Sequence, residues 1–385
     1  MNNTLKIMFL SISILILIVG CEKQEQVEKF MEDGVEVIVN NLKPYKIRGE
    51  QNSLRLEEKF TIDTEKDAIA EIGLTDIINF DVNSKGNIYF LKRRSEKNLI
   101  FKFDQNGKYM TSFGRMGEGP GEIARGYILT IGAEDEVIIS DPTRRINYFD
   151  RNGEFKRYVK LEPNITFTQD LENGNYLVQK QILHPDGEYA EWARCICDNK
   201  FFEIKELDRH RRAHYQIGVK QGYPFHNLVH FVSEGKIYVG NTENGYEIRK
   251  YDLEGNLERR IKKEYLPVLI STEKRRKFEE DFGGSNRTEG IFFHKYYPPY
   301  QYLFVDDEEN LFVMTYEEGE NPGEYMYDVF NSEGIFSLRL SLGNICMYNL
   351  FNFQFATAKN KRLYCLREKD SGYKELVVYK MIWEY

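Results

Sequence analysis

A short turn that runs straight into a β-rich, aromatic strand recurs six times along this chain of 385 residues. The strands that follow these turns begin at residues 88, 137, 176, 237, 311 and 363. A recurrence at intervals of roughly 40–70 residues indicates that one supersecondary unit is used repeatedly. This repeat constrains the fold more than any other feature of the sequence, although it does not indicate a ligand.

A second repeated signal is a hairpin turn that follows an aromatic-rich strand. It occurs at residues 103–107, 149–153 and 251–255, with weaker copies at 197–200 and 330–334. The Asn-Gly and Glu-Gly pairs in these turns supply the positive φ angles that tight hairpins need. Each unit therefore has the order strand, turn, strand, loop, strand, hairpin, strand, which is the pattern of a four-stranded antiparallel propeller blade.

Two segments carry a resemblance to a known family. Residues 88–122 and 137–159 resemble NHL-type propeller repeats, and most of residues 70–383 is similar to a family of lipoproteins with a six-bladed β-propeller. The resemblance implies an all-β fold with six blades of four antiparallel strands.

The last unit poses a problem of closure. It has a first turn but no second hairpin, because only a few residues follow Trp383. A blade without its outer strand leaves an unpaired edge, which proteins avoid. We therefore expect residues 54–62 to supply the missing strand and close the ring. Residues 34–48 compete for that role or lie against the outside of the barrel.

The N-terminal segment predicts export. The apolar run at 7–19 is shorter than the roughly 20 residues that span a bilayer, and it is typical of a secretory signal peptide at residues 1–20. Residues 18–21 resemble a bacterial lipobox, which implies that Cys21 carries lipid; the alternative is an ordinary signal peptide in which Cys21 is incidental. Because no aspartate follows Cys21, we expect anchoring to the outer membrane, on its periplasmic or its surface side.

The mature chain divides into two parts. Residues 21–33 are charged and lack a core pattern, which predicts a flexible tether before a propeller at 34–385. Near residues 262–298 the repeat is interrupted by an insertion, in which capping residues at 271–272 and the pair Gly283-Gly284 delimit a predicted helix. We expect Phe278 on this helix to pack inward.

Composition excludes several classes of protein. The net charge of −8 argues against nucleic acid as a partner. Four cysteines follow Cys21, too few for a disulfide scaffold. Cys195 and Cys197 lie on the same face of a predicted strand with no second pair at ligand spacing, so we expect buried thiols and predict neither a metal nor a cofactor.

The order of strands sorts the loops onto two faces. The first turns and the hairpins share one face, which is acidic, and we call it the tight-turn face. The middle loops and the crossovers between blades share the other face, which is richer in cations and aromatic side chains, and we call it the crossover face. Because long loops on a rigid scaffold often bind ligands, we predict a site on the crossover face. The candidate residues are Arg93, Arg94, Arg144, Arg145, Arg211, Arg212, Tyr296, Tyr297 and Tyr300, together with His230 on a predicted innermost strand.

Two classes of function fit this pattern. The first is a non-catalytic outer-membrane lipoprotein that binds a glycan, a peptide or a partner protein. The second is a lyase or hydrolase that acts in the central channel. The predicted innermost strands carry only scattered polar groups, chiefly Asn79, Thr130, Thr166, His230 and Gln354, so binding is favoured and no catalytic residue is assigned.

Overall fold

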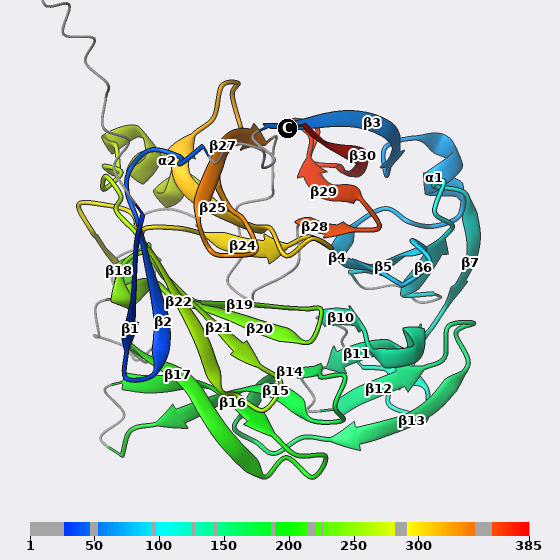
Figure 1. The fold of residues 1–385 in the computed structure, drawn as a ribbon. Coiled ribbons are helices and arrows are strands. Elements are labelled where there is room, and N and C mark those ends of the chain that lie inside the picture. Colours follow the sequence, from blue (N-terminus) through cyan, green and yellow to red (C-terminus); the bar gives the residue numbers. More distant parts are fainter. Residues whose placement is uncertain are drawn as a thin grey trace, which may run out of the picture.

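The computed structural model describes residues 27–46, 53–93, 98–124, 128–141, 145–185, 189–213, 221–224, 226–281, 291–342 and 356–384. Within these ranges the chain forms an all-β, six-bladed propeller whose blades surround a central channel (Figure 1). No helix in the described ranges is both long enough and apolar enough to cross a membrane.

Each blade is a four-stranded antiparallel sheet, numbered here from the innermost strand outward. Blade 1 contains β4 (Ile77–Val82), β5 (Ile88–Lys92), β6 (Ile100–Phe103) and β7 (Tyr109–Phe113). Blade 2 contains β10 (Ile128–Ile131), β11 (Val137–Asp141), β12 (Arg145–Phe149) and β13 (Phe155–Lys160). Blade 3 contains β14 (Ile165–Asp170), β15 (Tyr176–Leu183), β16 (Tyr189–Cys197) and β17 (Glu203–Ala213).

The second half of the ring repeats this order. Blade 4 contains β19 (Leu228–Ser233), β20 (Lys236–Asn241), β21 (Glu247–Asp252) and β22 (Leu257–Lys263). Blade 5 contains β24 (Tyr302–Val305), β25 (Leu311–Glu318), β26 (Tyr325–Phe330) and β27 (Phe336–Leu342). Blade 6 contains β28 (Ala356–Lys359), β29 (Arg362–Glu368) and β30 (Lys374–Glu384), and its fourth strand is β3 (Ser53–Asp63).

The inner strands are buried on both faces, because each blade packs against its two neighbours. All four residues of β24 are buried, and in β4 only Asp81 is not. Such strands appear in the sequence as short apolar runs between turns rather than as strict alternation. Aromatic pairs fill the space behind them; the ring centroids of Phe90 and Phe103, for example, lie 5.4 Å apart, edge to face.

The predicted closure of the ring is confirmed. Strand β3 pairs antiparallel with β30 along its whole length, from Ser53 opposite Glu384 to Asp63 opposite Glu375. Ile62 is buried at this seam, where the N-terminal strand takes the outer position of the last blade.

The segment expected to compete for that role lies on the outside of the barrel instead. Strand β2 (Val35–Asn40) pairs in parallel with β22, and β1 (Glu28–Glu32) pairs with β2, so blade 4 becomes a six-stranded sheet (Figure 1). All five residues of β1 are exposed, whereas Val37 and Ile38 of β2 are fully buried.

The predicted helical insertion is also present. Helix α2 (Thr272–Asp281) packs Phe278 against Tyr223, with ring centroids 3.8 Å apart. The partner elements are the short parallel strands β18 (Gln221–Tyr223) and β23 (Ile291–Phe293). The remaining short elements are α1 (Asp67–Glu71), β8 (Arg115–Met116), β9 (Glu122–Ile123), and the 3-10 turns at Ala133–Asp135 and Thr242–Asn244.

Candidate functional site

The first turns of the blades contact one another around the channel. The backbone N–H and the hydroxyl of Ser84 donate to the carboxylate of Asp135 over 2.8 and 2.9 Å. Asn360 donates to the carbonyl of Ser84 over 3.3 Å, and the backbone N–H of Lys361 donates to Asp307 over 2.9 Å. Blades 5, 6, 1 and 2 are therefore joined by their turns on one face, as the order of strands predicts.

The hairpins reach the same face. The hydroxyl of Tyr89 and the ammonium of Lys102, both in blade 1, donate to the carbonyl of Arg151 in the hairpin of blade 2. In blade 3, Asn173 of the first turn donates to the carbonyl of Leu253 in the hairpin of blade 4 over 3.1 Å. The tight-turn face is thus one hydrogen-bonded surface.

A cavity of about 200 Å³ occupies the central channel at the end that opens on this face. All six innermost strands contribute to its wall, and several lining residues belong to the first turns themselves. The polar lining residues are Asn79, Asp81, Thr130, Gln169, Asp170, Glu172, His230, Ser233, Glu234, Tyr302, Thr357 and Lys359. A space of this size holds one side chain or a small molecular group.

The charge of the lining is strongly unbalanced. Among the described residues it contains the carboxylates of Asp81, Asp170, Glu172 and Glu234, against one ammonium, that of Lys359. Glu172 and Glu234 are exposed at the mouth of the cavity, whereas Asp81 and Asp170 are part-buried, so these carboxylates act on a charge inside it through a dielectric between that of the protein interior and that of bulk solvent. The cavity therefore favours a cation.

Asp81 is positioned by the strand of the next blade. One of its carboxylate oxygens accepts a hydrogen bond of 2.7 Å from the backbone N–H of Ile131 in β10. Two residues earlier in β4, the side-chain oxygen of Asn79 accepts a hydrogen bond of 2.7 Å from the backbone N–H of Leu129. Two polar side chains of β4 thus satisfy the inner edge of β10, and this bonding fixes the carboxylate at the channel.

Asp170 is the carboxylate of the lining whose pKa is raised by burial. Burial raises the pKa of its carboxyl group to about 6, against the opposing influence of the Tyr148 hydroxyl, which donates to it over 3.0 Å, and of the Arg157 guanidinium. The guanidinium of Arg157 itself lies 3.5 Å from the centroid of the Tyr148 ring. Asp170 is therefore charged above about pH 6 and becomes neutral below it.

His230 does not offset these carboxylates. It lies in β19 and lines the cavity, but burial lowers the pKa of its imidazole well below the usual value, and the nearby cation of Arg194 lowers it further. Arg194 is fully buried in blade 3, where it donates to the side chain of Gln179 over 2.7 Å and to the carbonyl of Leu228 over 3.2 Å. The imidazole is thus neutral at physiological pH.

The described arginines predicted for the crossover face make structural contacts. Arg93 forms an ion pair of 3.2 Å with Asp76. Arg145 donates to the carbonyls of Glu118 and Glu122 over 2.9 and 3.0 Å, which holds the glycine-rich crossover between blades 1 and 2. Arg211 lies on the outermost strand of blade 3, 3.7 Å from Glu191. These three side chains come from different blades and do not converge.

The three candidate tyrosines also lie in different environments. Tyr300 is fully buried in the core and donates to the carbonyl of Glu247 over 3.1 Å, so its expected exposure in a binding loop is wrong. Tyr297 stacks on Tyr316, with centroids 4.3 Å apart. Only Tyr296 is exposed among the three. Cys21, Arg94 and Arg144 lie outside the described residues, and of Arg212 only the backbone is described, in β17.

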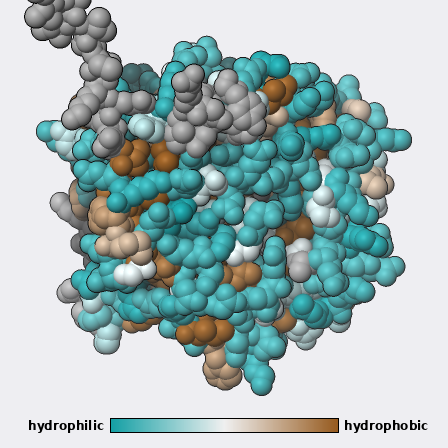
Figure 2. Space-filling view, in the orientation of Figure 1, coloured by the Kyte–Doolittle hydropathy of each residue, from teal (hydrophilic) through white to brown (hydrophobic). Residues whose placement is uncertain are grey.

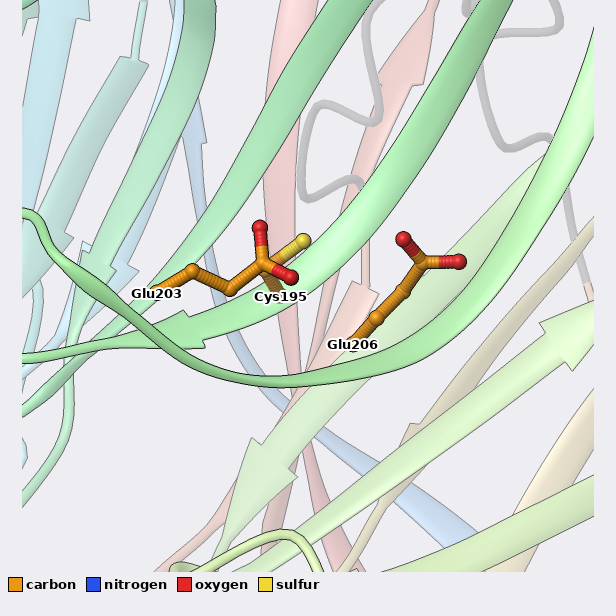
Figure 3. Close-up of side chains that lie close together, drawn as sticks. All are labelled: Cys195, Glu203 and Glu206. Atoms are coloured by element: carbon orange, nitrogen blue, oxygen red, sulfur yellow. The ribbon is translucent and has the colours of Figure 1, made fainter.

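A group of potential metal ligands lies elsewhere, on the outer strands of blade 3. Cys195, Glu203 and Glu206 approach within 4.8 Å of one another (Figure 3). Burial raises the pKa of the Cys195 thiol to about 12, and Lys180 forms an ion pair of 2.8 Å with Glu203. A neutral thiol and a competing ammonium make this group a poor metal site, because a thiol must lose its proton to bind a metal.

The carboxylates of the cavity are the residues that sequence reasoning missed. Asp81 and Asp170 were inside predicted innermost strands, at or next to the residue that precedes the first turn. An acidic residue near the same end of two innermost strands was the available signal, because those ends meet around the channel.

Comparison with known proteins agrees with this architecture. The model of a family described as a 6-bladed beta-propeller matches residues 71–265, just over half of the chain. The chain belongs to this six-bladed β-propeller family. No protein with a curated description matches the sequence.

Solved structures show the same fold. One is the crystal structure of a protein from Bacteroides fragilis NCTC 9343 that carries the provisional name of an exported protein. It matches with a TM-score of 0.51 and 11% sequence identity, over 91% of this chain and 100% of that one. At this identity the likeness concerns the fold alone.

Proposed function

We propose that this propeller is a non-catalytic, lipid-anchored binding protein of the outer membrane, and that its channel mouth binds an ammonium group presented by a peptide, a protein or a glycan. The observation that carries the proposal is the excess of carboxylates in a cavity at the tight-turn face. The lipid anchor and the NHL-like character of the repeats rest on the sequence, and the exported name of the Bacteroides fragilis structure supports export.

The charge and size of the cavity select the ligand group. An ammonium group meets Asp81, Asp170, Glu172 and Glu234, while Lys359, the one lysine in the described part of the lining, lies at blade 6. Hydrogen bonds to a charged partner contribute about 1.5–3 kcal/mol each, so one well-placed carboxylate changes affinity by about ten- to a hundred-fold.

Catalysis in the channel is the alternative, and the described lining favours it less. The carboxylate of Asp81 accepts a backbone hydrogen bond, and that of Asp170 accepts one from Tyr148. Burial lowers the pKa of the His230 imidazole so that the ring is neutral. Because hydrogen bonds already hold these carboxylates, they are suited to supply a fixed negative charge rather than to transfer protons.

The test uses a probe that isolates the ammonium group. We expect Nα-acetyl-lysine methylamide to shift NMR signals of the channel lining, and the isosteric norleucine amide to leave them unchanged. Glucosamine in place of the lysine amide distinguishes a glycan ligand from a peptide ligand. Equal binding of the lysine and norleucine amides would contradict the proposal.

Variants locate the binding site. Asp170→Asn removes the negative charge and keeps an oxygen that can accept from Tyr148. Glu234→Gln removes the negative charge at the turn of blade 4. Each variant is expected to weaken binding of the lysine probe about tenfold or more. Glu279→Gln on the exposed side of α2 is the matched control. The arginine-rich crossover face stays a hypothesis for an anionic ligand, and Arg211→Glu tests it with Nα-acetyl-aspartate methylamide: binding of this anionic probe that is lost in that variant alone would support a site there.

A further inference from the structure

A strip of exposed apolar side chains lies beside the point where the chain enters the propeller. Leu42, Tyr265, Leu266, Leu269 and Tyr296 expose 40%, 37%, 68%, 58% and 42% of their surface. Figure 2 shows hydrophobic side chains on the side of the molecule where Figure 1 places β1, β2 and α2. Isolated exposed apolar residues are ordinary, whereas a contiguous group indicates an interaction surface.

Backbone pairing makes these residues one surface. Strands β2 and β22 run parallel, so both end at the same edge of blade 4, and Leu42 and Tyr265 follow directly. At that edge the N–H of Glu264 donates to the carbonyl of Asn40 over 2.9 Å. Leu269 then pairs with Tyr296 in an isolated β-bridge, which brings the far end of the insertion alongside.

The same edge is where the tether arrives. Glu28, the first residue of β1, lies opposite Val39 near the end of β2, so the register places Val27 at Asn40, two residues before Leu42. The six residue-to-residue steps from Cys21 to Val27 span about 20 Å when fully extended. A lipid on Cys21 therefore keeps this edge of the propeller within about 20 Å of the bilayer.

The side chains around the strip suit the surface of an anionic bilayer. Lys43 and Lys46 are exposed just after Leu42, and Lys295 is exposed just before Tyr296, with its ammonium 5.1 Å from the centroid of the Tyr296 ring. Against the exposed carboxylates of Glu28 and Glu264 at the same edge, these three lysines leave a small excess of positive charge. Leucine and tyrosine partition into the interface between headgroups and acyl chains, and each lysine near an anionic surface contributes about 1 kcal/mol.

We propose that this strip, with its flanking lysines, docks onto the bilayer that holds the lipid anchor. The inference rests on the anchoring part of the proposed function. Docking at the crossover end of blade 4 directs the tight-turn face, and with it the acidic channel mouth, away from the membrane.

The experiment uses the mature chain with Cys21→Ser, which carries no acyl chains, and vesicles of phosphatidylethanolamine and phosphatidylglycerol in a 3:1 ratio. We expect the chain to float with these vesicles, and the double variant Leu266→Glu/Leu269→Glu to lower its partition coefficient about tenfold or more. The matched control is Phe202→Glu/Ile204→Glu, which places the same charges at two exposed apolar residues near the hairpin of blade 3. This control is expected to float like the parent.

Three results would overturn the docking surface. They are a parent chain that stays in solution, a strip variant that floats as well as the parent, and a strip variant whose only change is a smaller mass on gel filtration, which would assign the strip to a second copy. Because no acyl chain is present, the result is independent of modification at Cys21. Because binding of the lysine probe is measured separately, failure of the channel site leaves this test unaffected.

Discussion

Asn40 joins the N-terminal hairpin to two blades, and its replacement by leucine tests whether that hairpin is part of the folded core. The side-chain amide of Asn40 donates to the carbonyls of Lys262 and Gly334 over 3.1 and 3.0 Å. Its oxygen accepts from the backbone N–H of Phe336 over 2.8 Å. Asn40 is 1% exposed, so water does not replace these partners.

The magnitude follows from the groups that lose a partner. Leucine has the same number and branching of side-chain heavy atoms as asparagine, although its methyl groups make it larger, and it can form none of the three bonds. A buried polar group left without its hydrogen bond costs about 1–3 kcal/mol. The N–H of Phe336 is the most affected group, because it loses its acceptor and the leucine side chain supplies no other. Because a carbonyl has a second lone pair and leucine gains some transfer free energy, we expect a net loss of about 2–4 kcal/mol in the free energy of unfolding.

The assay is equilibrium unfolding in urea, followed by far-UV circular dichroism and by tryptophan fluorescence. Coincident transitions support the two-state treatment on which the free energy depends. Asn256→Leu, at an exposed asparagine of the hairpin in blade 4, is the control and should change stability by less than about 0.5 kcal/mol. A loss below 1 kcal/mol at Asn40, or one equal to the control, would refute the structural role of the hairpin.

Three further predictions follow from the fold and the site. Deletion of residues 22–33 removes β1, whose five residues are all exposed, and should leave the melting temperature nearly unchanged. Deletion of 22–63 also removes β2 and the closing strand β3 and should abolish cooperative unfolding; equal melting temperatures would disprove closure by β3. Because the folded pKa of Asp170 is about 6, above the ordinary 3.8, its carboxyl favours the folded state below about pH 4 and loses this contribution as pH rises to 6, so Asp170→Asn should flatten the dependence of stability on pH in that window. Cys21→Ser in the exported protein should prevent partitioning into detergent, and unchanged partitioning would rule out the lipid anchor.

The architecture was predictable because its signals are local. The turns before Ile88 and Val137 and the hairpins after Phe103 and Phe149 each specify a strand boundary within a few residues. The number of first turns predicts six blades, and the lack of a second hairpin in the last blade predicts that another segment supplies the closing strand. The parallel addition of β2 to blade 4 left no such signal, because an added strand at an outer edge needs no particular turn.

The site was less predictable because side-chain direction in a propeller depends on the neighbouring blade. Inner strands are buried on both faces, so the sequence does not separate a residue that faces the channel from one that faces another blade. Tyr300 belongs to the aromatic run at 296–300, yet its ring packs between blades 4 and 5, 5.3 Å from Tyr246. Arg145 holds a crossover that ends 23 residues earlier in the chain. Contacts at such separations do not appear in local patterns.

The two ends of the propeller differ in charge and in their distance from the tether, and the topology accounts for both differences. The ends of the innermost strands and the first turns lie close to the channel axis, so the carboxylates of Asp81, Asp170, Glu172 and Glu234 line one cavity. Strands β2 and β22 end at the opposite edge, where the tether arrives. On the proposed anchor, an anionic bilayer attracts the lysines beside the strip and repels the acidic turns. Both forces decay within about 10 Å at 0.1 M salt. They act only once the tether has brought the protein close, and both then favour the orientation in which the channel mouth faces arriving ligands.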